Sequence, residues 1–275
     1  MSNCKVIALT NQKGGVEKTT TAVNLGVSLV QQGKKVLLID ADAQANLTMA
    51  LGYNRPDDIP ITLSTVMQNI IDDKTLDASH GIIHHREGVD LLPSNIELSG
   101  FEVRLINAMS RERVLKTYVN EVKKNYDYVL IDCMPSLGMI TINALAAADS
   151  VIIPTQPHYL SAKGLELLLR SVSMVKRQIN PKLRIDGILM TMVMPRTNIS
   201  KEITATVKSA YGQKIKVFDT EIPHSIRAVE ATAEGKSIFA YDKSGKVAAA
   251  YEQFGKEVAE IGEKQRNQNR ADRIR

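Results

Sequence analysis

Short runs of Val, Ile and Leu alternate along the chain with longer segments of helical periodicity. The runs show little polar alternation, which is typical of strands covered on both faces of a parallel sheet. The predicted strands are Lys5–Thr10, Lys35–Asp40, Val89–Leu92, Tyr128–Asp132, Ser150–Pro154 and Ile185–Val193, and predicted helices include Glu97–Asn107, Arg111–Lys123 and Ala162–Ile179. This order predicts an α/β fold, a doubly wound and mostly parallel sheet with helices on both faces.

The chain of 275 residues is long enough to bury a core without disulfides or metals. We found no internal repeat and no low-complexity linker, so the sequence predicts a single domain over residues 1–263. Val247, Tyr251, Phe254, Val258 and Ile261 form an apolar stripe that predicts a last helix docked on the body. Residues 264–275 hold almost no large apolar side chains, and we expect a disordered tail.

Positive charge is concentrated in that tail. The formal net charge of the chain is +5. Residues 264–275 contain five basic residues and one acidic residue, so the body is nearly neutral. Any surface that binds DNA must therefore be a local patch together with the tail.

The cysteines and the N-terminus predict a cytoplasmic protein. Cys4 and Cys133 have no paired spacing, which argues against a disulfide framework and suits a reducing compartment. No apolar stretch approaches the length of a membrane span, and the first apolar run is too short for a signal peptide.

A glycine-containing loop lies between the first predicted strand and the first helix. Backbone N–H groups and a helix N-terminus at this place can bind a phosphate. Lys18 is placed to reach nucleotide phosphates, and the Thr19 hydroxyl is placed to ligate Mg2+. The general phosphate-loop pattern fails at both glycine positions, because Gln12 and Glu17 stand there.

Several motifs together resemble the deviant Walker A ATPases of the ParA/MinD family, and most closely its ParA/Soj partitioning branch. Lys13–Thr20 (KGGVEKTT) resembles the loop KGGVGKTT of that family. Asp40–Gln44 (DADAQ) is similar to the family's DxDPQ block, and Tyr128–Ser136 (YVLIDCMPS) to its Walker B block. The resemblance continues through Thr141–Ala144, Arg196–Asn198 and Ile222–Pro223, and covers roughly residues 4 to 261.

The resemblance implies a role for each matching residue. Lys13, Lys18 and Asp42 take the catalytic roles: Lys13 reaches across a dimer to the partner's phosphates, Lys18 binds phosphate, and Asp42 positions the attacking water. Thr19 ligates Mg2+ directly, and Asp40 and Asp132 do so through water. The implied nucleotide-binding set is Lys13, Gly14, Gly15, Val16, Glu17, Lys18, Thr19, Thr20 and Pro223, and the implied DNA-contacting residues are Arg196 and Arg227.

The function implied is ATP hydrolysis that controls chromosome or plasmid partitioning. ATP and Mg2+ are expected to form a sandwich homodimer that binds DNA without sequence preference on the nucleoid and is released when a ParB-like partner stimulates hydrolysis. Two alternatives remain open. One is a MinD-like regulator of division that cycles on membranes, and the other is a DNA-binding scaffold made inactive by Glu17.

Glu17 is the main departure from the family pattern, since glycine stands there in the family. If the position needs a positive φ, glutamate costs roughly 1–3 kcal/mol. Its carboxylate is expected either to face solvent or to lie against the loop N–H groups and Lys18, where a phosphate would bind. In the second case Glu17→Gly would tighten ATP binding by roughly tenfold or more. Smaller departures are Ala43, Ala45 and Met134.

Overall fold

The computed structural model describes residues 4–74, 77, 79–158, 161–195 and 197–274. Its sheet has eight strands in the order β3-β4-β2-β5-β1-β6-β7-β8. They are β1 (Lys5–Leu9), β2 (Val36–Ala41), β3 (Ile83–His84), β4 (Asp90–Leu92), β5 (Tyr128–Cys133), β6 (Ser150–Thr155), β7 (Arg184–Val193) and β8 (Val217–Pro223). Every pair is parallel except β3 with β4. The predicted doubly wound, mostly parallel sheet is confirmed.

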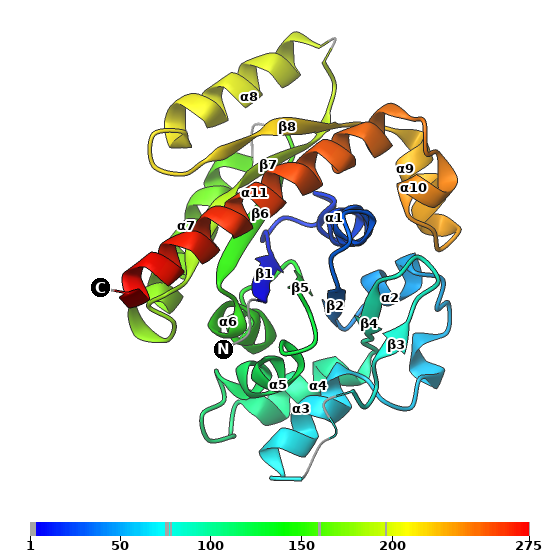
Figure 1. The fold of residues 1–275 in the computed structure, drawn as a ribbon, viewed down its shortest axis with the longest axis vertical. Coiled ribbons are helices and arrows are strands. Elements are labelled where there is room, and N and C mark those ends of the chain that lie inside the picture. Colours follow the sequence, from blue (N-terminus) through cyan, green and yellow to red (C-terminus); the bar gives the residue numbers. More distant parts are fainter. Residues whose placement is uncertain (1–3, 75–76, 78, 159–160, 196, 275) are drawn as a thin grey trace.

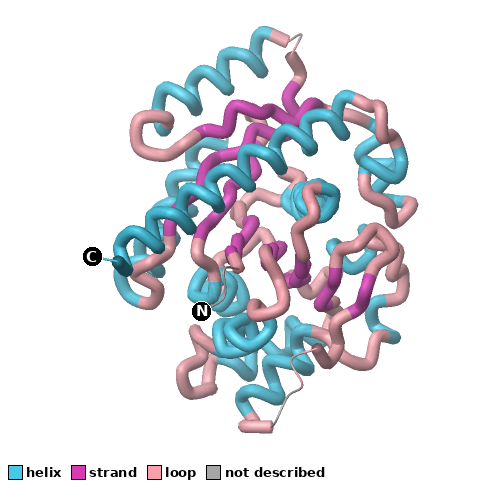
Figure 2. The backbone as a smooth tube through the Cα atoms, viewed as in Figure 1, coloured by secondary structure: helices cyan, strands magenta, loops and turns pink. Residues whose placement is uncertain are grey.

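Helices cover both faces of this sheet (Figures 1 and 2). They are α1 (Lys18–Gln31), α2 (Asn46–Ala50), α3 (Leu63–Ile71), α4 (Glu97–Leu105), α5 (Val114–Val122), α6 (Met139–Ala147), α7 (Ser161–Gln178), α8 (Asn198–Tyr211), α9 (Ile226–Ala233), α10 (Ile238–Tyr241) and α11 (Lys246–Ile274), with a single 3-10 turn at Pro56–Asp58. None of these helices, as far as the structure describes them, is long and apolar enough to cross a bilayer.

The central strands are buried because each supplies side chains to two separate cores. In β1, Val6 and Ala8 pack in one core with side chains from α3 to α8. Ile7 and Leu9 point to the other face and pack with α1, α2, α9, α10 and α11. This two-sided burial explains the unbroken apolar runs in the sequence.

The chain end differs from the prediction of a disordered tail. Helix α11 continues through Ile274. Its first half is fixed by Tyr251, Phe254 and Val258, which are fully buried in the core. No Gly or Pro follows Gly262. Extending an established helix through good helix formers costs little, so the tail remains helical.

Candidate functional site

The loop between β1 and α1 is held open by contacts to β6 and β7. The Asn11 side chain accepts a hydrogen bond from the Lys13 N–H (3.0 Å) and donates one to the Pro154 carbonyl (2.8 Å). The Thr191 hydroxyl donates to the carbonyl of the buried Val16 (3.0 Å). Gly14 and Gly15 are exposed, and a Cβ at either would meet no atom within 4 Å. The loop therefore borders open space at the N-terminus of α1, where unpaired helical N–H groups can bind an anion.

Lys18, the first residue of α1, carries a buried ammonium beside this loop. Its Nζ donates to the carbonyl of Lys13 (3.3 Å). Burial lowers the pKa of Lys18, while the charges of Asp132 and Asp42 oppose that shift. A bound phosphate would give the Lys18 ammonium a charged hydrogen-bond acceptor, whereas the Lys13 carbonyl is neutral.

Three acidic residues end the two neighbouring strands β2 and β5. Asp40 and Asp132 are partners in the strand register, and both are almost completely buried. Burial raises the pKa of Asp40 to about 7 and that of Asp132 to about 8, and the Asp40 carboxyl adds to the rise at Asp132. Asp42 is the first residue after β2. It is 8% exposed and accepts a hydrogen bond from the Gln44 N–H (3.0 Å).

The residues present fit a bound Mg2+. The Thr19 hydroxyl donates to Asp132 Oδ2 (2.6 Å), while Asp132 Oδ1 is buried and has no hydrogen-bond partner in the described part of the chain. Asp40 is already used, because its Oδ2 accepts from the N–H and the hydroxyl of Thr48 (2.8 and 2.7 Å). A hard cation prefers such oxygen ligands and would offset the crowding of carboxylates. The predicted metal residues therefore come together, with Thr48 as a supporting residue that the sequence did not indicate.

The backbone of Glu17 meets the condition under which the sequence implied strain. It immediately precedes α1 with φ 60° and ψ 34°, in the left-handed region that favours glycine. Ala45, the other residue at a family glycine position, is also left-handed, with φ 53°. Both residues therefore add backbone strain that a glycine would avoid, and Glu17 does so without closing the loop between β1 and α1.

The Glu17 side chain takes neither of the two expected positions. It is half-buried, and the backbone of Met192 in β7 gives its carboxyl a hydrogen bond that lowers the pKa, but burial dominates and raises that pKa to about 7. Its charge also raises the pKa of Tyr251, a buried residue of α11 whose hydroxyl lies 3.2 Å from that of Thr21. The carboxyl thus points towards β7 and α11, and Lys18 makes its contact with Lys13 instead.

Met192 completes a connection between the two ends of the loop. It lies within β7 at φ 53°, where the register with β8 is irregular. The Gln156 amide contacts the Met192 sulfur and also accepts from the ammonium of Lys13 (3.4 Å). Lys13 and Glu17 are therefore linked through Gln156 and Met192. Gln156 is a polar residue directly after β6, and this position could have identified it as a site residue from the sequence. Nothing in the sequence indicated such a role for Met192 or Tyr251.

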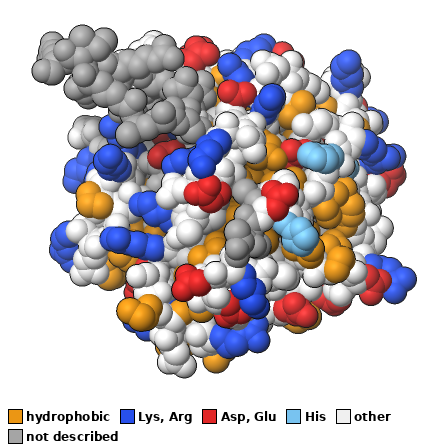
Figure 3. All heavy atoms as spheres, turned by 60° about the horizontal axis from the view of Figure 1, so that its bottom comes forward, with side chains coloured by type: hydrophobic (Ala, Val, Ile, Leu, Met, Phe, Trp, Pro, Cys, Tyr) orange, Lys and Arg blue, Asp and Glu red, His pale blue; other side chains and the backbone are white. Residues whose placement is uncertain are grey.

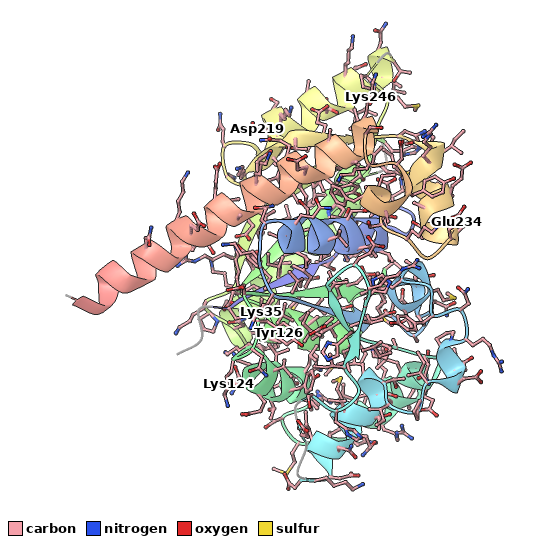
Figure 4. All side chains as sticks on the ribbon, turned by 45° about the vertical axis from the view of Figure 1, so that its right-hand side comes forward. Lys35, Lys124, Tyr126, Asp219, Glu234 and Lys246 are labelled. Atoms are coloured by element: carbon pink, nitrogen blue, oxygen red, sulfur yellow. The ribbon has the colours of Figure 1, made fainter. Side chains whose placement is uncertain are left out.

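The remaining predicted residues lie farther from the loop. Pro223 ends β8 in the wall of an open cavity of about 580 Å³ that Val193, Pro195 and Lys246 also line. Figure 4 shows Lys246 of α11 and Asp219 of β8, which line the same cavity. Arg227 on α9 is 64% exposed and pairs with Asp242 at 3.0 Å. Arg196 lies outside the described residues.

The comparisons with known proteins agree with this geometry. A family model described as "AAA domain" matches residues 4–185. The chain is 44% identical to sporulation initiation inhibitor protein Soj of Bacillus subtilis (strain 168), over 94% of this chain and 99% of Soj. It is 38% identical to chromosome partitioning protein ParA of Myxococcus xanthus (strain DK1622), over 92% of this chain and 87% of that protein. The chain belongs to the ParA/Soj family.

A solved structure shows the same architecture with ligands bound. The structure of cobyrinic acid a,c-diamide synthase from Mycobacterium smegmatis, with bound ATP analog and magnesium, superposes with a TM-score of 0.80 at 35% identity. The match covers 92% of this chain and 93% of that one. The ParA/Soj fold of this chain is thus a P-loop NTPase fold.

We expect Glu17→Gly to stabilise this ParA/Soj protein while leaving its affinity for ATP within about threefold. Glycine removes the left-handed strain and a carboxyl whose buried Oε2 has no hydrogen-bond partner among the described residues, which together favour the variant by roughly 1–2 kcal/mol, or a few degrees in Tm. The expected tenfold tightening of ATP binding no longer follows, because the carboxyl does not occupy the phosphate position.

Glu17→Ala is the matched control, since it removes the carboxyl but keeps the Cβ that causes the strain. Thermal unfolding and nucleotide titration of the three proteins separate the two effects. A lower Tm for Glu17→Gly would show that the contact with Met192 outweighs the strain.

Proposed function

We propose that the chain is an ATP hydrolase of chromosome or plasmid partitioning that dimerises with ATP and Mg2+ and binds DNA without sequence preference. The observation that carries this proposal is the set of Lys18, Thr19, Asp42 and Asp132 around one open glycine loop. The similarity to chromosome partitioning protein ParA supports a role in partitioning. A ParB-like partner that stimulates hydrolysis and a place on the nucleoid belong to the same proposal.

Each residue has a task in phosphoryl transfer, which depends on positioning and charge neutralisation. Lys18 and the N–H groups of residues 14–20 bind the phosphates, with Thr20 in the first turn of α1. Thr19 and Asp132 would hold Mg2+, with Asp40 behind them, and the ion supplies positive charge at the phosphate oxygens. Asp42 orients the attacking water and accepts its proton.

Lys13 acts from the partner subunit in this proposal. Among the described residues of the single chain its ammonium contacts the Gln156 side chain alone, at 3.4 Å, and the neighbouring Gly14 is exposed. A second copy placed against this loop would receive the lysine at its own phosphates, much as an arginine finger is supplied. Hydrolysis would then require the dimer.

The DNA-binding part of the proposal can be tested with a variant of Arg227. We expect Arg227→Ala to weaken binding about equally for unrelated duplex sequences and to make its salt dependence shallower by about one phosphate contact. Arg55→Ala is the control, because Arg55 is also exposed and paired, with Asp58 at 2.6 Å. A strong preference of the wild type for one sequence, or equal binding by Arg227→Ala and wild type, would count against this role.

The MinD-like alternative predicts binding to membranes. Its helix would need large apolar residues among the basic ones, and Ile274 is the only one after Ile261. Flotation with anionic liposomes distinguishes the two functions: we expect no ATP-dependent flotation.

A further inference from the structure

The edge of the sheet opposite the loop carries a group of basic side chains that the proposed mechanism does not use. The first residues of β1, β6 and β7 meet at this edge. The Arg184 N–H donates to the carbonyl of Asp149 (3.1 Å), and the Asn180 amide donates to the carbonyl of Ala148 (2.7 Å). These bonds fix the turn that enters β7 against the junction of α6 and β6.

Five basic residues lie on the segments that meet at this edge, together with the acidic Asp149. We call them the amino-edge cluster: Arg113, Lys116, Lys123, Lys182 and Arg184. Arg113, Lys182 and Arg184 are exposed, and the other two are half-buried. Burial lowers the pKa of Lys116, and the charges of Arg113, Lys123 and Lys182 lower it further, so these groups are close enough to repel one another. Asp149 offsets only part of this charge.

Helix α11 packs beside the same edge. Lys5 forms a buried ion pair with Asp186 (2.5 Å), and the Gln265 amide donates to the same carboxylate (3.0 Å). From there α11 projects beyond the body, on the side where Figure 4 places Lys35 and Lys124. Figure 3 shows many Lys and Arg side chains on the left half of the face turned to the reader. The described part of α11 therefore borders the amino-edge cluster.

We propose that the amino-edge cluster forms a second contact surface for the phosphate backbone of duplex DNA. A broad, exposed array of cations without an enclosing pocket suits a polyanion better than a small anion. Insertion into a membrane would need apolar side chains, and no exposed large hydrophobic residue of the described chain lies within residues 111–124 or 180–185. The inference rests on the proposed function, because it requires a DNA-binding dimer.

The position of the cluster makes it independent of dimer formation. In the proposed dimer the two loops face each other, at the carboxyl ends of the strands. The amino ends then point away from the interface on both subunits. The surface stays available in the ATP-bound dimer and adds phosphate contacts to those of Arg227.

The test is the double variant Lys116→Gln/Lys182→Gln of the full chain, titrated with two unrelated duplexes in ATP and Mg2+ over about 50–200 mM salt. Loss of two phosphate contacts should make the slope of log K against log salt shallower by about 1.8 and lower the affinity roughly tenfold. Lys74→Gln/Lys256→Gln is the control, with the same loss of charge at two exposed, paired lysines, and should bind within about twofold of wild type. Equal Tm values for all three proteins exclude misfolding.

Three results would overturn the inference. If the test variant keeps the wild-type slope while Arg227→Ala weakens binding, the cluster does not contact DNA and the proposed function stands. If the wild type binds neither duplex with ATP, the proposed function fails and the inference with it. If vesicles containing phosphatidylglycerol bind the wild type but not the test variant, and DNA binding is unchanged, the surface is a membrane contact.

Discussion

Lys18→Ala is expected to lower the affinity for ATP by roughly 10- to 150-fold. The buried ammonium has only the Lys13 carbonyl as a hydrogen-bond acceptor in the described structure, at 3.3 Å. Burial lowers the pKa of Lys18, and the charges of Asp132 and Asp42 oppose that shift. A phosphate at the loop gains a charge-assisted hydrogen bond from Lys18, and losing such a bond at a desolvated site costs about 1.5–3 kcal/mol. Titration with a fluorescent ATP analogue measures the loss directly.

The control for this variant is Lys18→Met, which keeps the length of the buried side chain. We expect the same loss of affinity with a smaller change in Tm, because the methionine fills the space that alanine leaves. ATP binding within threefold of wild type by Lys18→Met would show that the loop N–H groups suffice and that Lys18 is structural.

Asp42→Ala is expected to retain ATP binding within about threefold and to lose turnover by about 100-fold or more. Asp42 is 8% exposed and lies at the end of β2, with one carboxylate oxygen engaged by the Gln44 N–H (3.0 Å). The other oxygen can accept a proton from water, a contribution that is typically worth 100- to 10,000-fold in rate. Steady-state phosphate release and an ATP titration, run on the same preparation, separate turnover from binding.

Asp42→Asn keeps the hydrogen bond to Gln44 but cannot act as a base. We expect it to be as slow as the alanine variant. Turnover by Asp42→Asn close to that of wild type would remove proton transfer from the role of this residue. A wild type that binds ATP but does not turn it over, even with DNA and a ParB-like partner, would favour the inactive scaffold.

The parts of the site that the sequence already placed together depend on local chain order. Lys18, Thr19, Asp40 and Asp132 all follow or end strands of one parallel sheet, so that topology alone brings them to one edge. The outer strand β8 was missed because its residues alternate between buried and less buried positions, so that VFDTEIP lacks a continuous apolar run. The antiparallel β3 was missed because it has only two residues.

The wrong predictions depend on contacts between distant segments. The direction of the Glu17 side chain is set by the left-handed residue Met192 in β7 and by Tyr251 in α11, neither of which leaves a local signal. Helix α11 stays helical to Ile274 because its buried first half and the Gln265–Asp186 contact anchor it. Propensity alone does not show such tertiary support.

Control of DNA binding by the nucleotide tests the central claim most directly. The purified wild-type chain would be titrated with one long duplex in the presence of ATP and Mg2+, ADP and Mg2+, or no nucleotide. If Lys18, Thr19, Asp42 and Asp132 form the nucleotide site of a DNA-binding dimer, binding should be tight with ATP and at least about tenfold weaker in the other two conditions. Equal affinity in all three conditions would contradict the account.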